Sequence, residues 1–224
     1  MRLFIEGRVV NQNVANAFKP NTANNGFVSV VLGGTLPDGS AAVALALARA
    51  CKFAAHVKLG SGQNGALTAG QIYIGSERME ERLDMEQLHD QGFLIFQRRP
   101  GAAGYYFGVD NMADNGDFRI MVHGRVIDKA QRVAAAAYLP YIEDYIRIEN
   151  DGTINETDAK HLEGILDSAI RARMGGQMSN VRVVIDPNQD VINTSTLEIG
   201  VQVLPLGYLT WINVTLGLTA QIVQ

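Results

Sequence analysis

A regular alternation of apolar and polar residues near the end of the chain most constrains what this sequence can fold into. Apolar residues occupy every second position over this stretch: Ile212, Val214, Leu216, Leu218, Ala220 and Ile222. A period of two predicts a strand with one face packed and one face in water. Strands commonly span about five or six residues, so this strand can extend beyond its partner within the fold. Its unpaired edge is an aggregation hazard unless another backbone occupies it.

Two uses of this strand remain open, and both can hold together. The strand can pair with residues 197–203 in a hairpin through residues 205–208. Alternatively, residues from about 217 to 224 form an assembly arm that adds a strand to a neighbouring subunit's sheet. In that case Leu218, Ala220 and Ile222 fill one face of the neighbour and set the register. Charge is absent from residues 208–224, although exposed edges are usually blunted by charge.

Two helices with apolar faces are expected in the C-terminal half. The first begins at Asp128 as N-cap and runs to about residue 147, with Pro140 bending or splitting it. The second begins at a capping box of Thr153 and Glu156 and ends at the glycine pair 175–176. An earlier helix is expected over 40–57 with Ser40 as N-cap, and a short one within 76–91. Strands are expected at 27–32, 71–75, 93–99, 104–109, 118–122, 181–185 and 197–203.

These patterns predict an α/β (α+β) fold. A mixed sheet, formed largely by the segments after residue 180, is covered by the two long helices. We divide the 224 residues into an N-terminal α/β portion, 1–110, and a C-terminal domain, 111–224, packed as one unit.

The composition narrows the classes of function. The net charge of −4 comes from 19 basic and 23 acidic residues without a long block of one sign, which disfavours nucleic-acid binding. No window reaches the roughly 20 apolar residues of a membrane-spanning helix, and no secretory signal opens the chain. We therefore expect a soluble protein that starts in the cytoplasm. Cys51, the single cysteine, is expected to be a small core residue.

No cofactor, metal or catalytic residue is nominated. The glycines of segment 60–65 have dinucleotide-loop spacing, but the preceding strand and following helix are missing, which favours a flexible surface loop. Asp110, Asp114 and Asp117 fail the calcium-loop template, which favours solvated turn residues. The four histidines are scattered, and no strained serine elbow is present. We expect no enzyme.

The second helix carries a charged face. Lys160, Glu163, Asp167 and Arg171 follow one another at steps of three and four residues. We expect this face to lie opposite Leu162, Leu166 and Ile170 and to meet solvent or a partner.

The succession of segments resembles the contractile phage tail sheath family. The residues that carry the resemblance are the Leu-His-Asp-Gln-Gly-Phe segment at 88–93, the Gly-Tyr-Tyr-Phe-Gly-Val strand at 104–109, Arg-Val-Ile-Asp at 125–128, Ile-Asp-Pro-Asn at 185–188 and Asn-Thr at 193–194. The closest form is the variant of Mu-like prophages of gut Bacteroidetes. The resemblance covers residues 85–224, and residues 27–84 follow it by order alone.

The resemblance implies a sheath-like C-terminal domain in a structural subunit. Such subunits polymerise as rings into a helical sheath around an inner tail tube protein, with assembly in the bacterial host cytoplasm and a final place in a virion tail or phage-like particle. It also implies that Lys160, Glu163, Asp167 and Arg171 face the tube. The chain is shorter than typical sheaths, so a minimal variant or a shortened chain remains open. The rival functions are a tube or baseplate component, or a nucleotide-binding enzyme that uses loop 60–65.

Overall fold

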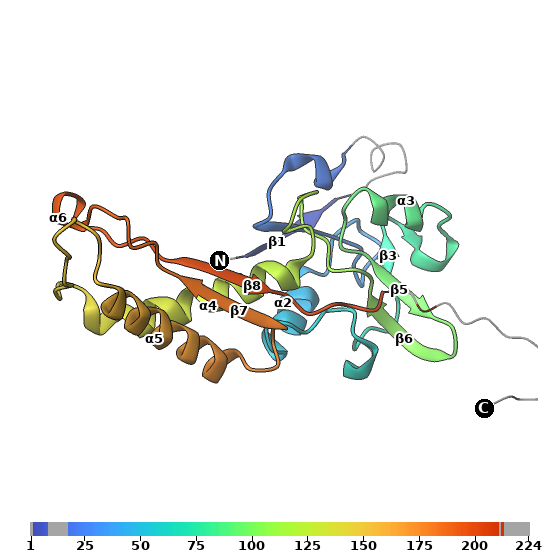
Figure 1. Cartoon of the computed structure of the whole chain (residues 1–224). Helices are drawn as coiled ribbons and strands as arrows, with labels where there is room; N and C mark the ends of the chain where they lie inside the picture. The colour runs from blue at the N-terminus through green and yellow to red at the C-terminus, as the bar shows by residue number, and fades with distance from the viewer. Residues whose placement is uncertain (1, 9–17, 211, 213–224) are drawn as a thin grey trace, which may run out of the picture.

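The computed structural model describes residues 2–8, 18–210 and 212. The N-terminal portion forms one end of the molecule, and a lobe of two long helices and a β-hairpin forms the other (Figure 1). Helix α4 (Met121–Tyr138) runs from the first into the second.

A parallel pair of strands lies at the centre of the N-terminal portion. Strand β1 (Leu3–Gly7) pairs with β2 (Val28–Leu32) from Leu3 opposite Val28 to Gly7 opposite Leu32. Residues 29–32 are all buried, as a near-continuous apolar run predicts for a strand covered on both faces. The one polar member, Ser29, donates from its hydroxyl to the carbonyl oxygen of Asn111 at 2.7 Å.

The remaining N-terminal elements enclose this pair. Strands β5 (Phe96–Arg99) and β6 (Ala102–Phe107) form the expected antiparallel hairpin, closed by Pro100 and Gly101. Its Phe96 and Phe107 rings lie 4.7 Å apart in a core that also takes in Met121 of α4. The other elements are η1 (Pro20–Ala23), α2 (Val43–Lys52), η2 (Gly62–Asn64), β3 (Tyr73–Ile74), β4 (Glu77–Arg78), η3 (Met79–Glu81) and α3 (Met85–Asp90).

The C-terminal lobe packs a hairpin on two helices. Helix α5 (Glu156–Met174) lies along α4, and β7 (Asn180–Val184) pairs antiparallel with β8 (Gly200–Leu204) over them (Figure 1). A second core joins Val126, Ala130 and Val133 of α4 to Leu166 and Ile170 of α5 and to the hairpin. Short η4 (Leu139–Tyr141) and α6 (Val191–Thr194) lie at the far end.

Helix ends were only partly predicted. Helix α4 ends at Tyr138, just before Pro140, so the expected run to about residue 147 is wrong. It begins at Met121, so the strand at 118–122 and the cap at Asp128 are also wrong. Asp128 lies within the helix and pairs with Arg2. The capping box of α5 is also wrong, because the side chain of Asn155 accepts from the amides of Thr157 and Asp158.

Two other segments depart from expectation for local reasons. Helix α2 is short and Ser40 does not cap it, and Cys51 is exposed on it and not a core residue. The helix expected within 76–91 is limited to α3, and Leu83 is 97% exposed. The buried Arg82 holds this segment in a turn by pairing with Glu77 and Asp84.

The α+β class is confirmed, and α4 and α5 pack against the hairpin as predicted. The strands differ from a single mixed sheet, since those of the described residues form four separate two-stranded sheets. Each antiparallel pair is local to its own part of the chain, so none of the sheets that the structure describes joins the two ends of the molecule.

Candidate assembly surface

The β7–β8 hairpin presents a strand edge without a partner in the described part of the chain. Strand β7 lies beside α5, whereas the far edge of β8 pairs with no strand that the structure describes. Backbone N–H and C=O groups along such an edge are a template for another strand. This hairpin is therefore a candidate interface for backbone pairing.

The two faces of the hairpin differ. Val181 and Val183 are buried against the helices, opposite Val203 and Val201. On β8 the packed face is incompletely covered, since Val201 is 36% exposed, and on the outer face Leu204 is 59% exposed. A two-stranded hairpin alone buries little, so an added strand would cover apolar surface that this hairpin leaves in water.

The charged face of α5 is tied to β7. Glu163 pairs with Lys160 at 2.7 Å and accepts from the backbone N–H of Ile185 at 2.8 Å. Asp167 pairs with Arg171 at 2.7 Å, and the Arg171 guanidinium also donates to the carbonyl oxygen of Val181 at 2.9 Å. The four residues thus run beside the apolar face along β7, and not opposite it as expected.

Exposure and charge vary along this face. The Lys160 and Arg171 side chains are 64% and 51% exposed, whereas Glu163 is 12% exposed. Burial raises the pKa of Glu163, but hydrogen bonds from Lys160 and Ile185 outweigh it and hold that pKa below its ordinary value. The Lys160 ammonium and the Arg171 guanidinium are therefore the charged groups of these ion pairs that a partner can reach.

The segment after β8 returns to the N-terminal portion. Tyr208 donates from its hydroxyl to the carbonyl oxygen of His56 at 2.7 Å, and the Lys58 ammonium lies 5.1 Å from its ring centroid. Lys58 also donates to the Thr210 hydroxyl at 3.3 Å. Residues 205–210, which we call the strap, thus fix the place where the chain leaves the hairpin.

A buried charged cluster lies beneath the strap. Asp110 is 0% exposed, and neither of its carboxylate oxygens has a hydrogen-bond partner among the described residues. Burial raises the pKa of Asp110, opposed in part by Lys58 and Arg125. Burial also raises the pKa of Tyr208, with Asp110 adding to the shift. The expectation that Asp110 is a solvated turn residue is wrong.

The glycine segment is built as a packed turn. Arg99 donates to the carbonyl oxygen of Gly60, and a Cβ at Gly62 would lie 2.5 Å from the same guanidinium. Arg49 donates to the carbonyl oxygens of Asn64 and Gly65 at 3.1 and 2.6 Å. Two arginines therefore hold the segment in place, whereas a flexible loop was expected. Arg49 comes from α2 and Arg99 from the β5–β6 hairpin.

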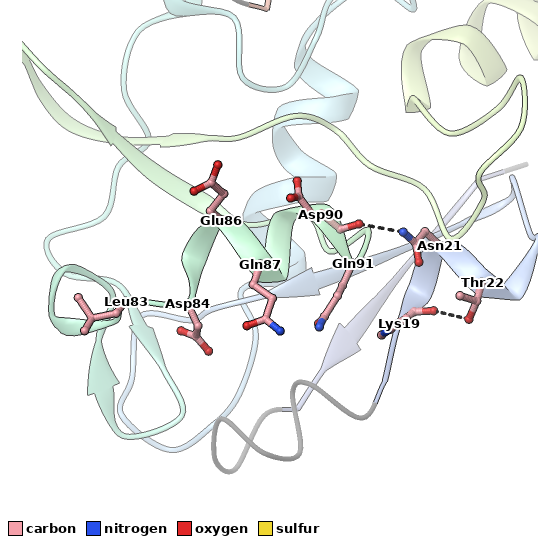
Figure 2. A pocket seen from close by; sticks show the side chains of 9 residues that line it. All are labelled: Lys19, Asn21, Thr22, Leu83, Asp84, Glu86, Gln87, Asp90 and Gln91. Carbon is pink, nitrogen blue, oxygen red and sulfur yellow. Dashed lines mark hydrogen bonds between the residues drawn. The ribbon is translucent and has the colours of Figure 1, made fainter.

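A polar groove between η1 and α3 offers no catalytic arrangement. Figure 2 shows Asn21 donating to the carbonyl oxygen of Asp90 at 2.8 Å, and Thr22 to that of Lys19 at the same distance. The first bond fastens η1 to α3, and the second lies within the η1 turn. Elsewhere among the described residues, no group of three acidic, histidine or cysteine side chains could hold a metal ion. In the same part of the chain, no helix is long and apolar enough to cross a membrane.

Sequence reasoning and structure overlap only in part at this surface. Leu218, Ala220 and Ile222 lie outside the described residues, as does the strand that was expected to pair with residues 197–203. The open edge of β8 and the strap were not predicted. The alternation of apolar and polar residues in β7 indicated one buried face. No pattern in the residues around Tyr208 indicates that it anchors the strap, because its partner His56 is 152 residues away.

Comparisons with known proteins point in one direction. The family model described as "DUF2586, C-terminal domain" matches residues 117–222. Comparison with the curated proteins gives no match.

Among solved structures, a chain of the six-fold symmetrised anti-feeding prophage (AFP) baseplate has a TM-score of 0.67 at 15% identity, over 97% of this chain and 60% of its own length. A chain of the contracted PVC sheath complex, from an extracellular contractile injection system, has a TM-score of 0.64 at 11% identity, over 97% of this chain and 64% of its own length. A chain of the contracted AFP helical sheath has a TM-score of 0.62 at 16% identity, over 96% of this chain and 61% of its own length.

The chain therefore spans about three-fifths of the length of the solved chains that it matches. At these identities the likeness concerns the fold, which extends over nearly all of this chain. The chain has the α+β fold found in chains of contractile injection systems.

Proposed function

We propose that this chain is a structural subunit of a contractile phage tail sheath, or of the sheath of a phage-like particle, and polymerises around an inner tube. The observation that carries the proposal is the fold likeness over 96–97% of the chain to chains from contractile sheath and baseplate structures. Such a subunit works by contact with copies of itself. It assembles in the bacterial host cytoplasm and ends in the particle.

Backbone pairing at the hairpin is the proposed mode of self-assembly. The open edge of β8 receives a strand from a neighbouring copy, and the arm at residues 217–224 supplies one, with Leu218, Ala220 and Ile222 on its packed face. The strap supports this arrangement, because Tyr208 fixes the base from which the arm departs. In this proposal residues 111–224 form the assembly domain and residues 1–110 the N-terminal portion.

The charged face of α5 is the proposed contact with the inner tube. Lys160 and Arg171 are the exposed members, and Glu163 and Asp167 hold them in place through ion pairs. Reversing both positive charges is expected to weaken association with the tube while leaving self-association intact.

A baseplate component is the second candidate, because one of the similar chains belongs to a baseplate structure. The two candidates differ in whether the chain alone forms long polymers. Nucleotide-dependent catalysis has less support, since Arg49 and Arg99 occupy the surroundings of loop 60–65.

Electron microscopy of the purified chain at high concentration tests the proposal. We expect rings or helical tubes from the intact chain and none after deletion of residues 217–224, with the circular dichroism of the two chains unchanged. Discrete particles without growth would favour the baseplate candidate. Undiminished polymerisation of the truncated chain would contradict the arm, and loss of folding on truncation would do the same.

A further inference from the structure

The far end of the C-terminal lobe exposes an apolar patch. Leu139 is 67% exposed, Ile142 65% and Tyr145 88%. They lie between the end of α4 and the start of α5, at the end of the molecule remote from β5 and β6 (Figure 1). Large apolar side chains gathered on an exposed surface mark a contact site.

This end is a structured unit, which we call the tip (residues 139–158 and 186–198). A small core holds its segments against the rest of the lobe, with Ile154 of the tip packed among Ala159 and Ile185 next to it. The backbone N–H of Ile154 donates to the carbonyl oxygen of Pro187 at 2.9 Å, which joins its two segments. The exposed patch is thus presented on an ordered support.

The tip carries a concentrated negative charge. Its only basic side chain among lysine and arginine is Arg147, against nine acidic ones: Glu143, Asp144, Glu149, Asp151, Glu156, Asp158, Asp186, Asp190 and Glu198. The tip therefore has a formal charge of −8 in a chain of −4, so the rest of the chain has +4. A partner that covers the patch must also satisfy this charge, which selects a basic surface.

The backbone beside the patch is strained. Glu143 has φ of 66°, a left-handed conformation that residues other than glycine adopt at a cost of roughly 1 kcal/mol. The Asp144 carboxylate accepts from the N–H of Tyr145 at 2.9 Å and stabilises the turn. A strained turn that exposes an isoleucine and a tyrosine does little for the fold, which fits a role in contact.

The opposite end of the same helix pair is basic. Tyr138 binds the carbonyl oxygen of Leu162, and Lys129 binds Gln177, so α4 and α5 are antiparallel and the tip lies at one end of the pair. The other end bears the exposed Arg173 in the last turn of α5 and the exposed Arg182 on β7. At about 1.5 Å per residue, the 19-residue helix separates the two ends by about 28 Å.

We propose that the tip docks on this basic end of a second copy of the chain. The inference rests on the proposed polymer and adds a specific contact to it. Two different, complementary surfaces on one subunit make a head-to-tail contact, which propagates into rings or helical polymers and does not stop at a dimer. Leu139, Ile142 and Tyr145 supply apolar area, and the opposed charges set the orientation.

A charge exchange tests this contact. The tip variant combines Glu143→Lys with Glu198→Lys, and the basic-end variant combines Arg173→Glu with Arg182→Glu. A control, Glu81→Lys with Glu86→Lys, makes the same charge change as the tip variant at exposed positions in the N-terminal portion. Assembly is measured by light scattering and sedimentation velocity over a range of concentrations, at low and at moderate salt.

Each of the first two variants is expected to raise the concentration needed for assembly about ten-fold. An equimolar mixture of these two variants is expected to assemble at a lower concentration than either variant alone. A chain with all four substitutions should assemble as the wild type does, and the control should not change. Tyr145→Ser should weaken assembly at both salt concentrations. Unchanged assembly of the tip variant, or no recovery in the four-fold variant, would overturn the contact while leaving the sheath proposal standing. Failure of the wild-type chain to assemble would instead count against the sheath proposal.

Discussion

The hydroxyl of Tyr208 donates a 2.7 Å hydrogen bond to the carbonyl oxygen of His56, 152 positions earlier in the chain. This bond joins the strap to the loop that follows α2. The ring also lies 6.2 Å from that of His123, near the start of α4. One tyrosine therefore closes a long loop that contains the entire C-terminal lobe.

Substitution of Tyr208 should separate the strap from the N-terminal portion. Tyr208→Phe removes one hydrogen bond and should lower the free energy of unfolding by about 1 kcal/mol. Tyr208→Ala also removes the ring and should increase amide hydrogen exchange in residues 205–210. Tyr145→Phe is a matched control because that side chain is 88% exposed. Unchanged exchange in the alanine variant would contradict the anchor.

Arg2 should be intolerant of lysine. Its guanidinium makes two 3.2 Å hydrogen bonds to the Asp128 carboxylate and lies 4.9 and 5.2 Å from the ring centroids of Phe27 and Phe118. Lysine cannot reproduce the planar two-point contact, so Arg2→Lys should cost about 1–3 kcal/mol. Arg8→Lys is the control, since its side chain is 71% exposed. Urea unfolding measures both, and equal stabilities would refute this account.

Asp110 should make stability fall as pH rises above about 4. Burial raises the pKa of Asp110 above 3.8, so the folded protein keeps a proton that the unfolded chain releases. The free energy of unfolding therefore decreases with pH between 3.8 and the folded-state pKa. Asp110→Asn should flatten this dependence in urea unfolding at a series of pH values. A variant with the wild-type slope would contradict the assignment.

A different carboxylate supplies the matched comparison for that experiment. Hydrogen bonds from Arg147 lower the pKa of Asp158 to about 2. Its contribution is present above its ordinary pKa of 3.8 and is lost as pH falls towards about 2. Asp158→Asn should therefore alter the pH dependence only on the acid side, opposite in direction to Asp110.

The cap of α5 can be assigned by two substitutions. The Asn155 side chain accepts from the amides of Thr157 and Asp158 at 3.1 and 3.3 Å, so Asn155→Ala should lower stability by about 1 kcal/mol. Thr153 instead binds Asp151 in the preceding turn, at 2.7 Å. Thr153→Ala should therefore have the smaller effect on the melting temperature. The reverse order would restore the capping box that the sequence suggested.

Calorimetry with ATP and NAD should detect no specific binding. Arg99 and Arg49 already bind the carbonyl oxygens of the segment that has dinucleotide-loop spacing. Micromolar binding that disappears in Gly62→Val would contradict this expectation. Because that substitution would also press on Arg99, circular dichroism of the variant should accompany the titration.

The sequence predicted features that depend on neighbours along the chain. The apolar period predicted α5 with its buried Leu166 and Ile170, and Pro100-Gly101 predicted the hairpin turn. Pro140 predicted an interruption of the first long helix, which the structure shows as the end of α4 at Tyr138. In each case one local property decides the backbone conformation. Helix starts were less predictable, because α4 begins after Ile120 without a side-chain cap, and Asn155 caps α5 in place of Thr153.

Features that depend on distant partners were not predictable. Asp128 is of a residue type that often caps helices, but its partner is Arg2, 126 residues away. Asp110 is of a residue type that is common in turns, yet it is buried near the strap and α4. The charge of the tip was also missed, because its two segments are separated by most of α5 and by β7 and meet only in three dimensions.

Helix α4 contributes to two separate cores. Met121 at its start belongs to the N-terminal core, and Val126, Ala130 and Val133 belong to that of the C-terminal lobe. A helix anchored at two points transmits torque: rotation about its axis would move side chains out of both cores at once. A twist of the lobe about this helix would therefore disturb the packing of Met121 in the N-terminal core as well.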